Sequence, residues 1–474
     1  DGSRMSESRI VLVSTPVPAD VHAFESDRTA QLIDSIRTLL DARWTGWSSM
    51  PAKSPQHTPP TDKWHGAGAS GFVLSQAEVT AIRDQVNTHM LWPAFHGRPD
   101  LMKFDAQAYE IFSEANRRLA STLRPQLRED DVVWVHDLLH APLAAALRDE
   151  SFSGPIGFLL YPSFPSADQL ATLPVHKQFL KELCCYDLVG FQTESCRARF
   201  QEAVTRFLGS SGKNNINRDS VSGPFGRVKT CVCEVPVDTR SAANYADSAA
   251  VRRSESYLRK CSNGSRLVGS FAPLNQAQGI LERLRSFEAL LEHAPKLCSQ
   301  VSMIQVMLPC GPWFEEDNDL RVEIEHEFMR INGRYASLEW TPIRYFHRSL
   351  AASRLTALYR SVRVGMFTPL NEGVNLRAKD FVAAQGPIDP GVLVASRLAG
   401  GPHKLTGALY ANPYDVASVA ATLERALEMP LEERRARWLS MMDILEARDL
   451  KAWCNEFINR LGLPASDRPS VMYA

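Results

Sequence analysis

Residues 132–137 read VVWVHD, a short apolar run that ends in two polar residues. The same pattern returns at 156–165 (IGFLLYPSFP) and at 187–193 (DLVGFQT), with helical patterns at 142–148 and 175–183 between them. Short apolar runs that alternate with helices are typical of parallel strands that are buried on both faces. This part of the chain therefore predicts an α/β fold, with a parallel sheet covered by helices.

The alternation extends in both directions from this stretch. A first strand is expected at 9–14 (RIVLVS), and a second series begins with a strand at 266–271 (RLVGSF). The second series continues through helices at 279–292 and 318–331 and through strands at 301–308, 363–367 and 391–395. We therefore predict two α/β halves of similar size.

Three segments lack a periodic apolar pattern and separate the predicted elements. Residues 48–70 are dense in Ser, Pro and Gly, and residues 209–225 are mostly polar. Because such compositions are typical of turns and loops, we predict surface loops in both places. Residues 236–244 are interpreted as the connector between the two halves.

Composition limits the class of protein. At 474 residues the chain exceeds one ordinary hydrophobic core. Lys and Arg number 53 against 54 Asp and Glu, so the chain carries no overall positive charge for a nucleic-acid partner. No apolar run reaches the roughly 18 residues of a membrane helix. We expect neither nucleic acid nor a membrane as a partner.

The cysteines and the N-terminal sequence indicate the cellular compartment in which we expect the protein. Nine cysteines are scattered along the chain, and Cys231 and Cys233 lack a second ligand pair at zinc-site spacing. We therefore expect no bound metal and reduced thiols. No signal-peptide pattern follows Met5, which adds to the expectation of a cytoplasmic protein.

Residues 368–385, TPLNEGVNLRAKDFVAAQ, form the most informative local pattern for function. A turn rich in Pro, Asn and Gly runs directly into a helical pattern. Free amides at the helix start, with Gly373 upstream, are expected to let a ligand approach the backbone. Glu372 and Asp380 can accept hydrogen bonds from sugar hydroxyls. We interpret this segment as a ligand-binding loop.

Several longer strings, in the same order along the chain, resemble the trehalose-6-phosphate synthases, the retaining glycosyltransferases of family 20 with the GT-B fold. The strings are LWPAFH (91–96), VWVHD (133–137), IGFLLYPSFPS (156–166), DLVGFQT (187–193), GVNLRAKDFVAAQ (373–385) and LYANPYDVASVAATLERALEMPLEER (409–434). The resemblance implies two Rossmann-like domains that face a cleft. The acceptor domain would span 1–237 and the nucleotide-sugar domain 238–447, with a helix at about 448–464 packing back on the first domain.

The family's phosphate-binding charges are largely missing from this chain. The resemblance places the Arg and Lys that clamp the donor diphosphate at Pro273 and Gln278. The Arg residues that contact the acceptor phosphate are lost in TPVP at 15–18 and at Gly311. No Gly-Gly loop is found between residues 19 and 32. The resemblance therefore indicates a family scaffold with altered substrates.

Some candidate site residues are kept or conservatively exchanged family positions. Others are departures: Arg377 and Lys379 stand where the family usually has uncharged residues, Gln278 stands at the position of the clamp Lys, and Arg83 at that of an acceptor-side Tyr. The candidate donor-site residues are Gly373, Val374, Asn375, Leu376, Asp380, Arg377, Lys379 and Gln278, with Asp380 for the ribose hydroxyls. The candidate acceptor-site residues are Trp92, Arg83 and Asp137, and the candidate catalytic residues are Asp137, Glu372 and Tyr161, the last in place of the family's His.

Arg377 and Lys379 stand at a helix start that ordinarily favours anions. They either restore positive charge near the donor diphosphate or are solvated surface residues. Residues two apart on a helix diverge by roughly 200°, so we expect only one of the two to face the site.

Other assignments also have a second interpretation. Asp137 could bind substrate or cap the following helix. Trp92 could stack on a sugar ring or fill the core beside Leu91 and Phe95. Tyr161 could offer its hydroxyl to a sugar oxygen. Arg83 could bind an anionic acceptor or lie solvated on a helix.

Two functions remain open at this stage. One is a retaining glycosyltransferase, or a pseudo-glycosyltransferase of specialised metabolism. It would transfer a sugar or cyclitol from a nucleotide-activated donor to a sugar-like or other polar acceptor, with no cofactor. The other is a non-catalytic regulatory or scaffolding homologue of a synthase. Partners could also include a second copy of the chain or a related synthase. We favour the enzyme, because the loop at 368–385 keeps its sugar-binding groups.

Overall fold

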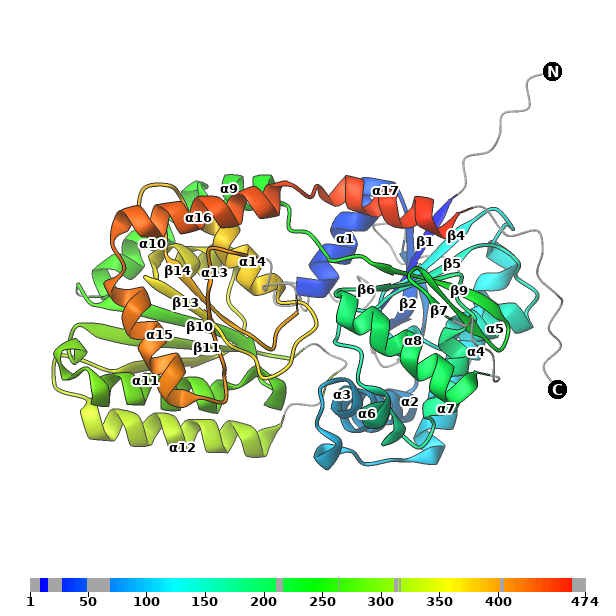
Figure 1. Cartoon of the computed structure of the whole chain (residues 1–474), viewed down its shortest axis with the longest axis horizontal. Helices are drawn as coiled ribbons and strands as arrows, with labels where there is room; N and C mark the ends of the chain where they lie inside the picture. The colour runs from blue at the N-terminus through cyan, green and yellow to red at the C-terminus, as the bar shows by residue number, and fades with distance from the viewer. Residues whose placement is uncertain are drawn as a thin grey trace, which may run out of the picture.

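The computed structural model describes residues 9–15, 28–48, 69–209, 216–262, 264–310, 314, 317–400 and 405–462. These residues form two α/β domains that lie side by side, the N-terminal domain on the right in Figure 1 and the second domain on the left. The sequence changes noted at 16–18 and Gly311, most of 19–32 and most of the predicted loop at 48–70 lie outside the described residues.

The first domain is built on a sheet of nine described strands. Seven run parallel in the order β3-β2-β1-β4-β5-β6-β9, and β8 and β7 add an antiparallel edge. The strands are β1 (Ile10–Val13), β2 (Arg43–Ser48), β3 (Ala69–Val73), β4 (Val132–Val135), β5 (Ile156–Leu159), β6 (Leu188–Phe191), β7 (Ile216–Asn217), β8 (Ser220–Gly223) and β9 (Gly226–Val232). The predicted strands of this half are confirmed, and β4, β5 and β6 are buried throughout.

The second domain repeats this plan with six described strands, all parallel, in the order β12-β11-β10-β13-β14-β15. They are β10 (Arg266–Pro273), β11 (Val301–Leu308), β12 (Ile343–His347), β13 (Val364–Phe367), β14 (Val392–Ser396) and β15 (Leu409–Ala411). In both sheets the chain starts at the centre, adds strands to one side and then returns to the other side. Ligands of such sheets bind beyond the carboxyl ends of the strands at this reversal, after β1 and β4 and after β10 and β13.

Helices cover the sheets. They are α1 (Arg28–Leu40), α2 (Gln76–Thr80), α3 (Trp92–Phe95), α4 (Ala106–Leu123), α5 (Leu143–Asp149), α6 (Ala167–Ala171), α7 (His176–Leu183), α8 (Glu194–Leu208), α9 (Thr239–Ala246), α10 (Ala249–Cys261), α11 (Ile280–His293), α12 (Asn318–Tyr335), α13 (Ala352–Ser361), α14 (Leu376–Ala384), α15 (Val416–Glu428), α16 (Leu431–Glu446) and α17 (Leu450–Leu461). The stretch Ala81–Leu91 between α2 and α3 is π-helical. Many of the helices start at a side-chain cap, as at Thr193 before α8 and Asn375 before α14.

Two predictions about connecting segments were wrong in part. The predicted loop at 209–225 contains β7 and β8, which pair with each other and with β9. These strands are too short and too polar for an alternating pattern to stand out. The predicted connector at 236–244 becomes helical at Thr239, because the side chain of Asp238 caps α9.

The end of the chain crosses between the domains. Helix α16 packs on the second domain, and α17 runs over the first, in red at the top of Figure 1. The ring of Phe457 stacks on Trp134 of β4, with ring centroids 4.5 Å apart. Gly157 and Gly190 make room for it, since a Cβ at either position would come within 2.8 Å of the Phe457 ring. Helix α17 therefore completes the core of a domain whose strands lie more than two hundred residues earlier.

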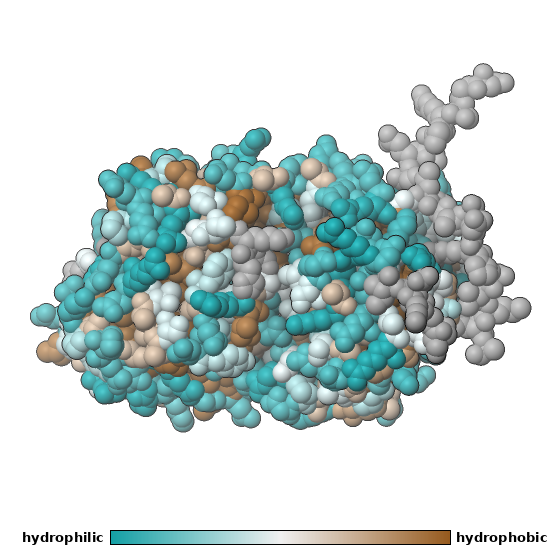
Figure 2. Space-filling view, viewed as in Figure 1, coloured by the Kyte–Doolittle hydropathy of each residue, from teal (hydrophilic) through white to brown (hydrophobic). Residues whose placement is uncertain are grey.

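The surface is mainly hydrophilic on the face shown in Figure 2, where hydrophobic residues form separate small patches. Within the described part of the chain, no helix combines the length and the apolar character needed to span a membrane. Hydrophobic side chains are instead concentrated in the clusters around the two sheets.

We predict that Phe457→Ala lowers the free energy of unfolding of the first domain by roughly 3–5 kcal/mol, because a fully buried ring is replaced by a cavity. Urea denaturation followed by tryptophan fluorescence would measure the loss. Phe104→Ala, at a ring that is 40% exposed, is the matched control and should change stability little. Equal losses in the two variants would contradict the role given to α17.

Candidate functional site

A pocket of about 220 Å³ lies between α1 of the first domain and the loops that follow β10 and β13 of the second. Pro273 and Gln278, the two positions where clamp cations are missing, both line it. Three guanidinium groups line the same space, those of Arg28, Arg283 and Arg377. Of these three cations, only Arg377 was predicted from the sequence to belong to the site.

Arg283 of α11 is the most deeply buried of these cations, with 1% of its surface exposed. Its guanidinium donates hydrogen bonds to Ser270 Oγ at 2.8 Å, to Thr368 Oγ1 at 3.3 Å and to the carbonyl of Gln278. All of these partners are neutral oxygens. Burial lowers the pKa of Arg283 to about 10, so it stays charged at neutral pH. Glu372 and Glu282 oppose the effect of burial on this pKa, and a pocket wall with this cation suits an anion.

Glu372 lies next to this cation. Its Oε1 accepts a hydrogen bond from Gln278 Nε2 at 3.4 Å, and its buried Oε2 has no hydrogen-bond partner among the described residues. Burial raises the pKa of Glu372 to about 7, against the opposing effects of Gln278 and Arg283. Near neutral pH this carboxyl can therefore accept a hydrogen bond from a ligand hydroxyl or donate one to a ligand oxygen.

Gly373 does not serve the purpose expected from the sequence. A Cβ at this position would overlap the carbonyl oxygen of Tyr161 and the adjoining backbone of Pro162 and Ser163. The chain segment that approaches Gly373 therefore belongs to the first domain and is no ligand. The glycine permits close contact between the domains, which corrects the prediction.

The other residues of this loop line the pocket. Val374, Asn375 and Leu376 all contribute to its wall. The Oδ1 atom of Asn375 accepts the amide of Ala378 at 2.9 Å and so caps α14. Its Nδ2 group is a hydrogen-bond donor, a group that suits a sugar hydroxyl or a phosphate oxygen.

Arg377 and Lys379 point in different directions. Arg377 lines the pocket, whereas Lys379 is 3% exposed and its Nζ lies 2.9 Å from Glu234 Oε1 and 2.7 Å from the carbonyl of Val235. The assignment of Lys379 to the donor site was therefore wrong. Its charge is used to join α14 to the chain that leaves the first domain.

Asp380, assigned to the ribose hydroxyls by the resemblance, is held by an arginine of the other domain. Arg28 donates from Nε to Oδ2 at 2.7 Å and from Nη2 to Oδ1 at 3.0 Å. The carboxylate is the largest cause of the raised pKa of Arg28. A second cavity, of about 590 Å³, lies on the far side of this pair and is also lined by Arg377 and Tyr359.

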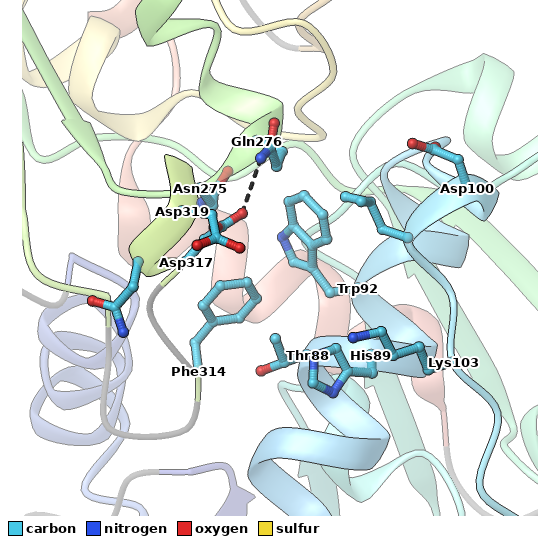
Figure 3. A pocket seen from close by; sticks show the side chains of 12 residues that line it. Thr88, His89, Trp92, Asp100, Lys103, Asn275, Gln276, Phe314, Asp317 and Asp319 are labelled. Carbon is cyan, nitrogen blue, oxygen red and sulfur yellow. Dashed lines mark hydrogen bonds between the residues drawn. The ribbon is translucent and has the colours of Figure 1, made fainter. Parts of the chain in front are cut away.

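A third cavity, of about 430 Å³, lies at another place between the domains (Figure 3). Trp92 of the first domain faces Phe314 of the second, with ring centroids 5.6 Å apart and planes at 66°. Gln276 Nε2 donates to Asp317 Oδ2 at 2.9 Å across the back of the cavity. Trp92 is half-buried, unlike its fully buried neighbours Leu91 and Phe95, and the ring of His96 stacks on it with centroids 4.5 Å apart.

Among the described residues that line this cavity, acidic side chains outnumber basic ones. Asp100, Asp317 and Asp319 line it together with Lys103 and His89. Figure 3 shows Asp317 and Asp319 near the aromatic pair, with Lys103 and His89 on the opposite wall. Asp100 is already paired with Arg98, whose Nη2 lies 2.7 Å from Asp100 Oδ2. The side of the cavity with Asp317 and Asp319 favours hydroxyl or amino groups over a phosphate.

Two of the remaining candidate residues, Asp137 and Arg83, make their described contacts within the first domain. The two oxygens of Asp137 accept the amides of Thr15 at 2.7 Å and of Leu139 at 2.6 Å, which is the capping arrangement. The guanidinium of Arg83 binds the carboxylate of Asp84. Neither contact supplies evidence for the acceptor roles of Asp137 and Arg83, which stay predictions.

The hydroxyl of Tyr161 lies 2.9 Å from Nδ1 of His136. Burial lowers the pKa of His136 to about 3 and raises that of Tyr161 above its usual range. Both groups are therefore neutral at physiological pH. This pair can orient a neighbouring group but is poorly suited to move a proton, and the catalytic role of Tyr161 stays a prediction.

The sequence profile described as Glycosyltransferase family 20 matches residues 17–462. The chain belongs to this family. It is 34% identical over 458 residues to a trehalose-6-phosphate synthase of Sodalis glossinidius, covering 96% of each chain, and 35% identical to that of Salmonella arizonae, covering 96% of this chain and 95% of that one.

Solved structures agree with the family assignment. A trehalose-phosphate synthase (UDP-forming) of Burkholderia xenovorans in complex with glucose-6-phosphate matches with a TM-score of 0.87 at 34% identity, covering 96% of this chain and 100% of that chain. An E. coli structure bound with UDP-2-fluoro glucose matches with a TM-score of 0.88 at 33% identity, covering 96% and 99%. The predicted family and GT-B fold are thus confirmed.

We predict that Glu372→Gln changes how stability depends on pH. The raised pKa of Glu372 means that the folded state resists ionisation, so the wild type loses stability as pH rises from about 4.5 to about 7. The loss is at most roughly 3.5 kcal/mol, since one pKa unit corresponds to about 1.4 kcal/mol. The glutamine variant should lack this loss. Urea denaturation between pH 4.5 and 8 would measure it, with exposed Glu446→Gln as the control; identical pH profiles for Glu372→Gln and the wild type would contradict the assignment.

Proposed function

We propose that this protein is a retaining glycosyltransferase of the trehalose-6-phosphate synthase type with altered substrates. It transfers a sugar or cyclitol unit from a nucleotide-activated donor to a polar, sugar-like acceptor. The observation that carries the proposal is the buried Arg283 in the wall of the 220 Å³ pocket, beside the two positions where the clamp cations are missing.

The pocket has the groups needed for a nucleoside diphosphate. Guanidinium groups bind phosphate oxygens with paired hydrogen bonds, and a partly buried site weakens screening by salt. When the bond to the sugar breaks, negative charge grows on the leaving diphosphate, and fixed cations stabilise that charge. Arg283 and Arg377 are the cations of the second domain that are placed to do this.

The same pocket has groups for the transferred unit. Glu372 Oε2 and Asn375 Nδ2 offer an acceptor and a donor to hydroxyl groups. Both residues lie within three positions of each other in the loop before α14, so the loop sets their spacing. A cyclitol presents the same hydroxyl pattern as a sugar, which is why the proposal includes both.

The 430 Å³ cavity supports an acceptor without phosphate. The aromatic pair of Trp92 and Phe314 suits the apolar face of a sugar-like ring, and the carboxylates of Asp317 and Asp319 suit hydroxyl or amino groups. A phosphate would meet these carboxylates unfavourably. The substitution at Gly311, where the resemblance places an acceptor-phosphate contact, agrees with this.

One observation favours the alternative of a non-catalytic homologue. Arg28 and Asp380 neutralise each other across the domains at the place where the resemblance puts the donor ribose. A regulatory protein that holds its domains together without a ligand would show such a contact. Measurements of nucleotide binding separate the two proposals.

We predict that nucleoside diphosphates or nucleotide-sugars raise the melting temperature of the wild type, since a ligand that binds only the folded state stabilises it. Arg377→Ala should weaken nucleoside diphosphate roughly tenfold or more, through loss of a charge-assisted hydrogen bond, and should weaken the nucleoside little. Calorimetric titration would measure both. Arg425→Ala, at an exposed arginine of α15, is the control. If no member of a panel of diphosphates and nucleotide-sugars binds, the non-catalytic alternative replaces the enzyme.

We predict that Trp92→Ala raises the KM for the acceptor while leaving the affinity for nucleoside diphosphate unchanged, because Trp92 lines a cavity separate from the donor pocket. Release of nucleoside diphosphate from donors in the presence of free polyols, aminocyclitols and their phosphate esters would measure this. Tyr257→Ala, at an exposed ring on α10, is the control. A strict preference for the phosphate esters would contradict the proposed acceptor class.

A further inference from the structure

Arg28 and Asp380 form an ion pair between the domains inside the proposed donor site, and the resemblance gave no role to Arg28. We propose that Arg28 is a diphosphate-binding residue of this protein, brought from the first domain in place of the missing clamp cations, and that Asp380 is the residue that positions it. The inference rests on the proposed function, because it names a further residue for the same donor site.

Arg28 is placed to reach a ligand in the smaller pocket. It is the first residue of α1, and its side chain lines both the 220 Å³ pocket and the 590 Å³ cavity. Pro273 and Gln278 lie in the second domain, on the other side of the smaller pocket. A diphosphate in this pocket would therefore meet Arg28 from the side opposite to the missing clamp. The first domain would thus supply positive charge to the same pocket in which the clamp cations of the second domain are missing.

The guanidinium of Arg28 has more N–H groups than Asp380 uses. Its five N–H groups can donate separately. Asp380 takes the Nε–H and one Nη2–H, along one edge of the planar group. The described contacts leave Nη1 and the second Nη2–H for another acceptor. The side chain keeps 23% of its surface exposed and lines both cavities.

The charge of the pocket around Arg28 also suits a diphosphate. Asp380 cancels the charge of Arg28, but the pocket as a whole stays positive through Arg283 and Arg377. A two-point contact with a carboxylate fixes the plane of the arginine, which otherwise has many rotamers. Asp380 thus orders the side chain before the ligand arrives, and this lowers the entropic cost of binding.

The specificity of the site follows from this arrangement. Both oxygens of Asp380 are engaged by Arg28, so the carboxylate is a weaker acceptor for ribose hydroxyls than the resemblance implies. Recognition then depends on the diphosphate more than on the ribose. The protein should accept inorganic pyrophosphate as a competitor and should discriminate little between ribose and 2′-deoxyribose diphosphates.

Calorimetric titration of the full chain with three probes tests the proposal: inorganic pyrophosphate, uridine diphosphate and uridine, with guanosine diphosphate and guanosine as a second series. Arg28→Ala should weaken pyrophosphate and the nucleoside diphosphates about tenfold or more. Arg28→Lys should recover part of the loss. Arg37→Ala, at the other end of α1 and paired with Asp34, is the matched control and should change nothing.

Asp380→Asn separates the two roles open to this carboxylate. As a positioning residue, its loss should weaken pyrophosphate several-fold and leave the nucleoside unchanged. As a ribose ligand, its loss would weaken the nucleoside and the nucleoside diphosphate equally and leave pyrophosphate unchanged, and this result overturns the proposal. Melting temperatures of all variants identify any that fail to fold, and Arg28→Lys and Asp380→Asn keep the shape of the pair.

Failure of this inference can be told from failure of the proposed function. If the wild type binds neither pyrophosphate nor any nucleoside diphosphate, both are wrong. If the wild type binds them and Arg28→Ala binds them equally well, the donor site stands and the role of Arg28 is wrong.

Discussion

The buried ion pair between Lys379 and Glu234 fixes the arrangement on which the site depends. The ammonium of α14 and the carboxylate just beyond β9 are both nearly inaccessible to water, and neither is stable there alone. The pair therefore sets α14 of the second domain against the chain that leaves the first. Because α14 also carries Asn375, Arg377 and Asp380, one contact places a cap, a pocket cation and a cross-domain carboxylate together.

The turns of α14 divide these tasks among different faces. Arg377 and Asp380 are three residues apart, so they lie on one face of the helix. Both line the larger cavity together with Arg28 of the other domain, and Asp380 is paired with Arg28. Lys379, between them in sequence, points away into the core. The site is thus composed from both domains. Its positive charge comes from side chains on α1, α11 and α14. The family resemblance instead places the clamp cations at the end of β10 and in the chain just after it.

The strands at 132–135 and 188–191 could be predicted because continuous apolar runs report burial directly. The pocket cations could not. Arg283 resembles any other helix arginine until its burial is known, and Arg28 is separated from Asp380 by most of the chain. Gly373 was identified as a place of close approach, correctly, but local sequence says nothing about what approaches. Sequence patterns report local geometry and burial, whereas partners across the cleft follow only from the tertiary structure.

Helix α17 has a consequence for the order in which the chain folds. The first domain holds the earliest strands, yet Phe457 and its neighbours from the last helix fill the space over β4, β5 and β6. Helix α1 covers part of that side, but the area under α17 stays uncovered during synthesis until α17 has left the ribosome. Contacts between such distant segments form slowly. The core of the second domain is formed by one stretch of the chain. The second domain can therefore fold before the first is complete.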